Sequence, residues 1–169
     1  MQNKPHILFL LLGSNLGDKK KQLNKAQDLI REMIGPVTRH SSIYETEPCG
    51  FSSENTFLNR ALKVSTFFSP EKVMMNIHEI EKTFGRERNQ EPYSSRTMDI
   101  DILFYDDLIL ISDTLKIPHP RLHDRKFVLV PLNEIAPRLI HPISGKTIKE
   151  LLADCKDTKK VWKFFQPKK

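Results

Sequence analysis

The chain has 169 residues, which suggests one domain spanning residues 1–169 and a hydrophobic core that needs no disulfide bonds. Its two cysteines, Cys49 and Cys155, lack metal-binding spacing and favour a reducing, cytoplasmic location, and the apolar run at residues 7–12 is too short to cross a membrane. The formal net charge of +6 fits an anionic ligand, but it also fits a nucleic acid.

The first half of the chain reads as strand, helix, strand, strand and helix. Residues 6–12 form a continuous apolar run typical of a buried strand, and a Gly-containing turn at 13–18 leads into a helix at 19–34, with Asp18 as its N-cap. Residues 37–44 and 57–68 read as strands separated by a turn-rich loop at 46–56. Ser69, Pro70 and Glu71 begin the second helix.

The second half begins with a polar, irregular segment at residues 85–95 that leads into an apolar strand at 98–104. We expect residues 108–111 to pair with that strand as a short hairpin, residues 127–135 and 147–152 to be helical, and residues 161–165 to form an edge strand. The order β-α-β-β-α-β with C-terminal additions predicts an α+β domain of the ferredoxin-like type. Its sheet should be mostly antiparallel, with helices packed on it.

Two aspartates stand out on the strand at residues 98–104. Met98, Ile100 and Ile102 share one face, whereas Asp99 and Asp101 share the other at a spacing of roughly 7 Å. Aspartate is unfavourable in strands, and two like charges this close repel each other. The pair indicates either the solvated face of an edge strand or a divalent cation held between the carboxylates.

Basic residues surround this strand in sequence: Arg86, Arg88 and Arg96 precede it, and His119, Arg121, His123, Arg125 and Lys126 follow it. Alone they could form a solvated basic surface. Together with the carboxylates they favour a nucleotide polyphosphate, because Mg²⁺ prefers carboxylates plus phosphate oxygens and arginine binds phosphate with a planar fork.

Three other polar residues have an ordinary structural interpretation. His78 and Glu81 lie three residues apart on the second helix, where a solvent-facing pair is the commoner case. Asn59 is either a satisfied polar core residue or a group that hydrogen-bonds a ligand, and its surroundings in sequence favour the first.

Several motifs together resemble one enzyme family, 6-hydroxymethyl-7,8-dihydropterin pyrophosphokinase, over nearly the whole chain. They are Gly13-Ser14-Asn15-Leu16-Gly17, Phe57-Leu58-Asn59, Gly85-Arg86-x-Arg88, Arg96-Thr97-Met98-Asp99-Ile100-Asp101-Ile102-Leu103, Ile117-Pro118-His119-Pro120 and the block from Arg125 to Pro137. The Arg-x-x-Asp-x-Asp strand with the His-Pro and Pro-Leu blocks is specific as a set.

The resemblance implies a cytoplasmic, monomeric enzyme of folate synthesis. It would transfer the diphosphoryl group of ATP to the hydroxymethyl oxygen of the pterin and release AMP, using two Mg²⁺ ions and needing neither nucleic acid nor membrane.

The resemblance also implies residue roles. Asp99 and Asp101 would hold the metal ions, and Arg86, Arg88 and Arg96 would act with them in catalysis. The nucleotide would be bound by His78, Glu81, Arg88, Tyr93, Arg96, Ile102, Thr114, Leu115, Lys116, His119 and Arg125. The pterin would be bound by Thr46, Glu47, Cys49, Phe57, Asn59 and Phe127.

The chain departs from the family pattern at a few positions. Pro92-Tyr93-Ser94-Ser95 stands where the family often has Arg-Trp-Gly-Pro, which removes one cation near ATP. His78 stands where glutamine is frequent, and Phe57 where tyrosine is frequent. None of these changes affects the aspartate pair.

Two other classes of function remain as alternatives. A ferredoxin-like module could bind nucleic acid on a basic face, but it would need exposed aromatic residues on its central strands. A structural or regulatory protein with a vestigial site would release no AMP.

Overall fold

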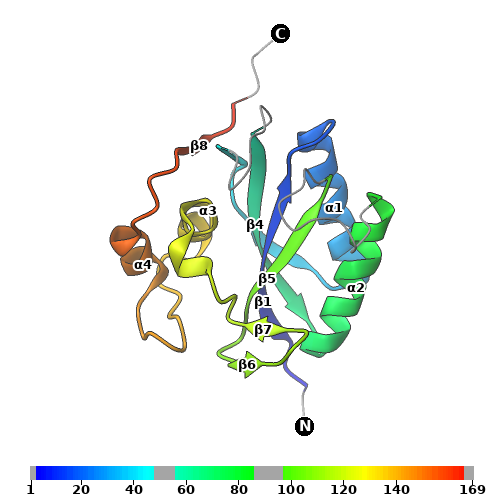
Figure 1. Cartoon of the computed structure of the whole chain (residues 1–169). Coiled ribbons are helices and arrows are strands. Elements are labelled where there is room, and N and C mark those ends of the chain that lie inside the picture. The colour runs from blue at the N-terminus through cyan, green and yellow to red at the C-terminus, as the bar shows by residue number, and fades with distance from the viewer. Residues whose placement is uncertain (1–2, 48–55, 86–96, 166–169) are drawn as a thin grey trace.

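The computed structural model describes all residues except 1–2, 48–55, 86–96 and 166–169. Its strands are β1 (His6–Ser14), β2 (Val37–His40), β3 (Tyr44–Thr46), β4 (Phe57–Thr66), β5 (Asp99–Tyr105), β6 (Leu110–Ile111), β7 (Lys116–Ile117) and β8 (Val161–Lys163). Its helices are α1 (Lys19–Met33), α2 (Pro70–Thr83), α3 (Lys126–Ile135) and α4 (Ile148–Asp154), with a short 3₁₀ turn at Leu122–Asp124 (Figure 1).

The main sheet has the strand order β5-β1-β4-β3-β8, and β2 also pairs with β4. Every neighbouring pair in it is antiparallel. Central β1 therefore lies between β4 and β5, as the ferredoxin-like order requires, and the predicted α+β fold is confirmed.

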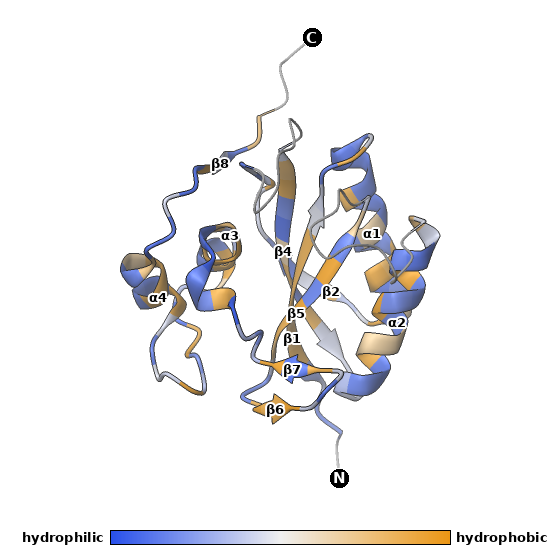
Figure 2. Ribbon diagram, viewed as in Figure 1, coloured by the Kyte–Doolittle hydropathy of each residue, from blue (hydrophilic) through white to orange (hydrophobic). Residues whose placement is uncertain are grey.

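The sheet separates two hydrophobic cores, because side chains alternate along β1. Leu8, Leu10 and Leu12 pack with α1 and α2 on one face, whereas Phe9 and Leu11 pack with α3 and α4 on the other. Figures 1 and 2 show the two pairs of helices on opposite sides of the sheet. This second layer explains why β1 reads as a continuous apolar run.

The helices start where the sequence predicts. The carboxylate of Asp18 accepts a hydrogen bond from the amide of Lys21, and the hydroxyl of Ser69 accepts one from Lys72. Thr147 and Glu150 form a capping box at α4. In the described part of the chain, no helix is both long and apolar enough to span a lipid bilayer.

Three sequence predictions about the strands were wrong. Strand β1 continues through Ser14, so Gly13 belongs to the sheet and not to the turn. Residues 37–44 form two strands and not one. The backbone amide of Ala61 in β4 donates its hydrogen bond to the hydroxyl of buried Ser41, so regular backbone pairing with β4 is interrupted between β2 and β3. Leu110–Ile111 pairs with β7 and not with β5, since the chain turns away from β5 at Asp106.

Candidate active site

The two aspartates lie where β5 faces the second core. Asp101 pairs with Leu11 of β1 and Asp99 pairs with Gly13, whereas Met98, Ile100 and Ile102 belong to the core under α1 and α2. The predicted shared face of the two carboxylates is therefore confirmed. Strand β5 is also an edge strand of its sheet, so an edge position and a cation site are compatible.

Asn59 lies across β1 from Asp99. Gly13 pairs with Asp99 on one side and with Asn59 on the other, so the two side chains are two strand spacings apart, about 10 Å. A Cβ atom at Gly13 would approach the Oδ1 atom of Asn59 to 2.8 Å. The missing side chain of Gly13 therefore lets the Asn59 carboxamide lie over β1.

The surroundings of Asn59 form the other half of the site. Asn59 is only 3% exposed, and its amide donates a long hydrogen bond of 3.4 Å to the hydroxyl of Thr46. Phe57 lies two residues earlier on the same face of β4. Asn59 is thus a buried polar group at the end of the sheet that carries Asp99, and its role as a ligand group stays a prediction.

A cavity of about 250 Å³ lies beside the outer strand β5. Five residues predicted to meet the nucleotide or the phosphates line it together with Asp101: Ile102, Thr114, Leu115, Lys116 and His119. Met74, Ile100, Asp113 and Pro120 complete its wall, and sequence reasoning did not assign them to a site. Met74 carried only a packing signal, because it belongs to the apolar stripe of α2.

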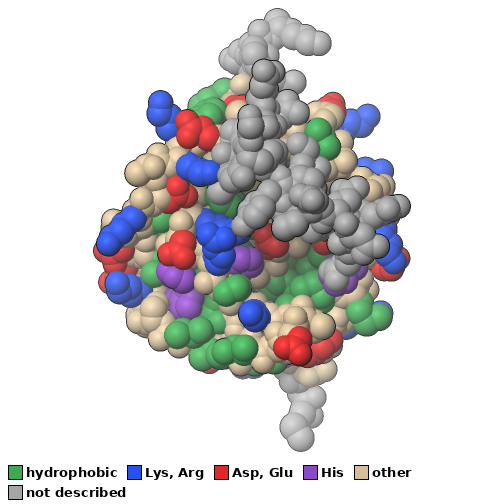
Figure 3. Space-filling model, in the orientation of Figure 1, with side chains coloured by type: hydrophobic (Ala, Val, Ile, Leu, Met, Phe, Trp, Pro, Cys, Tyr) green, Lys and Arg blue, Asp and Glu red, His purple; other side chains and the backbone are tan. Residues whose placement is uncertain are grey.

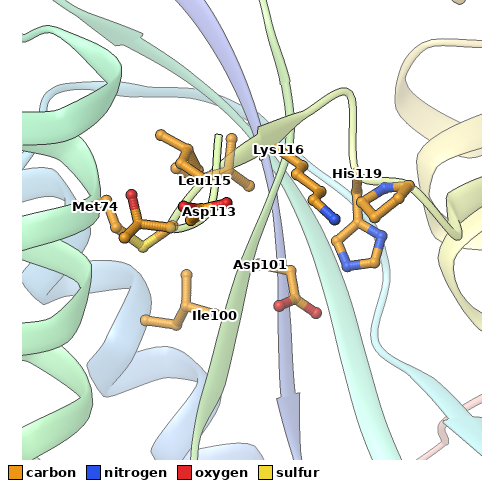
Figure 4. A pocket seen from close by; sticks show the side chains of 10 residues that line it. Met74, Ile100, Asp101, Asp113, Leu115, Lys116 and His119 are labelled. Carbon is orange, nitrogen blue, oxygen red and sulfur yellow. The ribbon is translucent and has the colours of Figure 1, made fainter. Parts of the chain in front are cut away.

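Figure 4 shows how this cavity divides. Ile100 and Asp101 point to opposite sides of β5, with Lys116 and His119 on the side of Asp101 and Met74 on the side of Ile100. One end of the cavity is therefore mainly apolar, although Asp113 also lies there, and the other end carries Asp101 and Lys116. This division suits a ligand with a flat base and a polyphosphate chain. On the face shown in Figure 3, basic and histidine side chains gather next to hydrophobic ones.

His119 is held as a neutral hydrogen-bond donor. Burial, reinforced by the charge of Arg125 and partly opposed by that of Asp99, lowers its pKa to about 4. Its Nδ1 atom accepts a hydrogen bond from the amide of Arg121 at 3.2 Å, so the remaining proton is assigned to Nε2. At neutral pH the ring therefore offers an N–H group and no charge.

The start of α3 brings one more predicted cation to this region. Arg125 is half-buried at the N-cap of α3, and its guanidinium lies 5.7 Å from the ring centre of Phe127. Phe127 packs at the margin of the core between α3 and the sheet. The ring of Phe127 and the face of Phe57 and Asn59 are thus both on the α3 side of the sheet.

The remaining predicted site residues divide into three groups. His78 and Glu81 lie on α2, and Glu81 is only 5% exposed, so the solvent-facing interpretation of that pair was wrong. Thr46 is buried at the end of β3. The backbone amide of the next residue, Glu47, donates to the carbonyl oxygen of Lys160. The predictions on Cys49, Arg86, Arg88, Tyr93 and Arg96 lie outside the described residues.

The described residues supply few metal ligands of their own. Within them, no group of three His, Cys, Asp or Glu side chains could hold a metal ion. Two same-face carboxylates nevertheless fit Mg²⁺, which binds one or two carboxylates and completes its octahedron with phosphate oxygens and water. The donor set therefore fits a metal that arrives with a polyphosphate.

A second cavity of about 380 Å³ shares His119 and Pro120 with the first and is also lined by His123 and His141. His141 is buried, its Nδ1 accepts from the amides of Ile143 and Ser144, and its ring lies edge-on to Phe104. Burial, with a smaller effect of His123, lowers the pKa of His141. These contacts make His141 a support of the turn that precedes α4.

A stacking surface for nucleic acid is not found on strands β1 and β5. Their phenylalanines, Phe9 and Phe104, are 4% and 1% exposed and are covered by α3 and α4. The structure therefore does not favour the nucleic-acid-binding alternative.

Comparison with known proteins adds independent information. A family model described as 7,8-dihydro-6-hydroxymethylpterin-pyrophosphokinase (HPPK) matches residues 9–137. The 2-amino-4-hydroxy-6-hydroxymethyldihydropteridine pyrophosphokinase of Aquifex aeolicus is 38% identical over 143 residues, which cover 85% of this chain and 88% of that protein. The Bacillus subtilis protein of the same name is 37% identical over 79% of this chain and 80% of its own length.

Other similar proteins are larger. A folate synthesis bifunctional protein of Arabidopsis thaliana is 41% identical over 76% of this chain, but the match spans only 26% of that protein. The HPPK-DHPS structure of Plasmodium falciparum has a similar fold, with a TM-score of 0.75, 19% identity and coverage of 90% of this chain and 46% of that one. The chain thus spans less than half of these longer proteins.

Proposed function

The chain belongs to the 7,8-dihydro-6-hydroxymethylpterin-pyrophosphokinase family, and from that premise we propose the assignment of its site. The protein is an ATP-dependent diphosphotransferase of folate biosynthesis. It transfers the pyrophosphoryl group of ATP to the hydroxymethyl oxygen of 6-hydroxymethyl-7,8-dihydropterin and releases AMP. The observation that carries the residue assignment is the row Asp99, Gly13 and Asn59 across three strands.

The nucleotide occupies the cavity beside β5. Ile102, Thr114 and Leu115 contact its base and ribose, and the apolar end of the cavity supports this placement. Lys116, Arg125 and the Nε2–H group of His119 lie toward its phosphates. His78, Glu81 and Tyr93 complete the nucleotide contacts, and Arg86, Arg88 and Arg96 stabilise the charge of the group that is transferred.

Asp99 and Asp101 hold Mg²⁺, and the family resemblance suggests two ions. When bound, Mg²⁺ neutralises the charge of the transferred phosphates and orients the attacking and leaving oxygens. The contribution of the chain is to position its groups, because phosphoryl-type transfer depends on alignment and charge more than on covalent help.

The pterin lies on the α3 face of the sheet at the end of β4. Asn59 hydrogen-bonds its edge, Phe57 and Phe127 flank its ring, and Thr46, Glu47 and Cys49 contribute mainly backbone groups. This placement directs the hydroxymethyl group toward Asp99 across Gly13. We also expect the protein to act as a cytoplasmic monomer that needs neither nucleic acid nor membrane.

The decisive experiment incubates the protein with ATP, Mg²⁺ and the reduced pterin and separates AMP from ADP by chromatography. Stoichiometric AMP that depends on both the pterin and Mg²⁺ is the expected result. Asp101→Asn serves as the matched inactive control. ATP that stays intact, together with salt-sensitive RNA binding, would overturn the assignment in favour of the nucleic-acid-binding module.

A further inference from the structure

The first turn of α1 contacts the starting points of both strands that carry the proposed ligand groups. Strand β4 begins at Phe57 and strand β5 at Asp99, and β1 lies between them. Helix α1 follows β1 after a short turn, so its N-terminus lies at the end of the sheet where β4 and β5 begin (Figure 1). Two of its side chains, Lys19 and Gln22, reach these two strands separately.

Gln22 reaches the start of β5. Its carboxamide lies 2.8 Å from the carbonyl oxygen of Leu16 and 3.1 Å from that of Thr97. Carbonyl oxygens only accept hydrogen bonds, so the atom between them is the amide nitrogen, which donates to both. Thr97 is two residues before Asp99, and Gln22 therefore ties the metal-binding strand to the turn after β1.

Gly17 leaves room for this arrangement. A Cβ atom there would come within 2.9 Å of the other end of the Gln22 carboxamide, and the backbone of Gly17 has a φ of +70° that favours glycine. The hydroxyl of Ser14 lies 2.8 Å from the Gln22 amide on the side of β1. The carboxamide is thus enclosed by the turn and has one orientation that satisfies its neighbours.

Lys19 reaches the start of β4. Its ammonium donates to the carbonyl oxygen of Thr56 at 3.0 Å, one residue before Phe57. The hydroxyl of Thr56 donates to Glu45 of β3 at 2.6 Å, and Glu45 also accepts from the indole of Trp162 at 3.0 Å. Lys19 therefore ties the residue before β4 to α1, while Thr56 and Glu45 tie the same point to β3 and β8.

We propose that Lys19 and Gln22 are positioning residues that set the pterin groups of β4 and the carboxylates of β5 at their working separation. This proposal rests on the function proposed above. Each residue acts through one strand, so each should affect one substrate: Gln22 the nucleotide with Mg²⁺, and Lys19 the pterin. Neither residue needs to touch a substrate to do this.

The test measures binding as well as turnover. Isothermal titration calorimetry gives the Kd for the reduced pterin and for a non-hydrolysable ATP analogue with Mg²⁺, and AMP release gives kcat and KM. Gln22→Met should weaken binding of the analogue about tenfold and leave the pterin Kd within about twofold. Lys19→Met should do the reverse, since one lost anchoring hydrogen bond corresponds to about tenfold.

Matched controls separate positioning from a general loss of stability. Lys21→Met removes an exposed lysine from the same turn and should leave both Kd values unchanged. Gln27→Met removes a buried glutamine of α1 that bonds Arg60 of β4 and not β5, so it is the control for Gln22 and should leave the Kd of the ATP analogue unchanged. Gln22→Glu keeps the shape but loses the N–H donors and should resemble Gln22→Met, whereas Lys19→Arg keeps a donor and should retain pterin binding.

The two proposals can fail separately. Absence of AMP release by the unsubstituted protein would refute the function, and the different effects of the two variants on the two binding constants would still test the positioning role of Lys19 and Gln22. If Gln22→Met and Lys19→Met change both constants equally, or neither, the positioning role is wrong.

Discussion

Replacing Gly13 with alanine tests whether the missing side chain at this position of β1 is needed to place the Asn59 carboxamide. The added Cβ atom would lie 2.8 Å from the Asn59 Oδ1 atom, and an ordinary contact begins at 3.4 Å, so the carboxamide must move by about 0.6 Å. The backbone itself accepts alanine, because Gly13 has no left-handed φ. The fold should therefore persist while the proposed pterin ligand is displaced.

The expected loss of pterin affinity follows from the proposed hydrogen bond between Asn59 and the pterin. A shift of 0.6 Å takes a hydrogen bond of normal length beyond its useful range, and leaving a buried amide unsatisfied costs about 1–3 kcal/mol. Since 1.4 kcal/mol is tenfold in affinity, Gly13→Ala should weaken pterin binding by about 5- to 140-fold. The melting temperature and the affinity for the ATP analogue should change little.

A double-mutant cycle identifies the cause. Asn59→Ala removes the atom that the new methyl group meets, so adding Gly13→Ala to it should weaken pterin binding no further. Calorimetry on the two single variants and the double variant gives the coupling energy. Unchanged pterin affinity in Gly13→Ala, or additive losses in the double variant, would refute the reasoning.

Three other outcomes follow from the structure. Asp99→Asn and Asp101→Asn should each reduce AMP release by at least about 100-fold at saturating Mg²⁺ while the melting temperature stays near that of the unsubstituted protein, because metal-borne charge neutralisation is worth several kcal/mol. His141 has a lowered pKa, so its contribution to stability is full above pH 6.5 and is lost as the pH falls below that value; because His119 contributes to the same acid limb, His141→Asn should make this limb shallower in urea unfolding without removing it. Tyr44→Phe should lower the free energy of unfolding by about 1–3 kcal/mol, because the buried hydroxyl donates to Glu134.

Each of these outcomes has a control. Wild-type turnover in either aspartate variant would exclude the metal assignment. His40→Asn changes an exposed histidine of β2 and should leave the acid limb as it is. Tyr105→Phe removes a comparable hydroxyl, which donates to the carbonyl of Phe68 at 2.9 Å. If Tyr105→Phe lowers the free energy of unfolding more than Tyr44→Phe does, the stabilising effect assigned to the bond with Glu134 is wrong.

Local patterns in the sequence were sufficient for the frame of the fold. The alternation of Met98, Ile100 and Ile102 with Asp99 and Asp101 placed the carboxylates on the correct face, because period two is a property of any strand. Caps such as Asp18 and Ser69 placed the helix starts for a similarly local reason. These features depend on neighbours within a few residues.

Features that depend on distant contacts could not be predicted in this way. The hydroxyl of Ser41 breaks the second strand only because Ala61 lies opposite, and the role of Gly13 is visible only once Asn59 lies next to it. The buried position of Glu81 depends on how α2 packs, which helical periodicity alone left open. The contacts of Gln22 with Thr97 join residues 75 positions apart, and no local pattern indicates them.

The second helical layer extends past residue 137, where the family match ends. Ile148 and Leu151 of α4 fill the core that also holds Phe9 and Leu11, and β8 pairs with β3 through Trp162 opposite Glu45. A version shortened to the matched segment would expose apolar side chains on β1 and leave β3 with an open edge. The family match therefore ends before the folded unit does, and we expect residues 138–165 to unfold together with the rest of the domain.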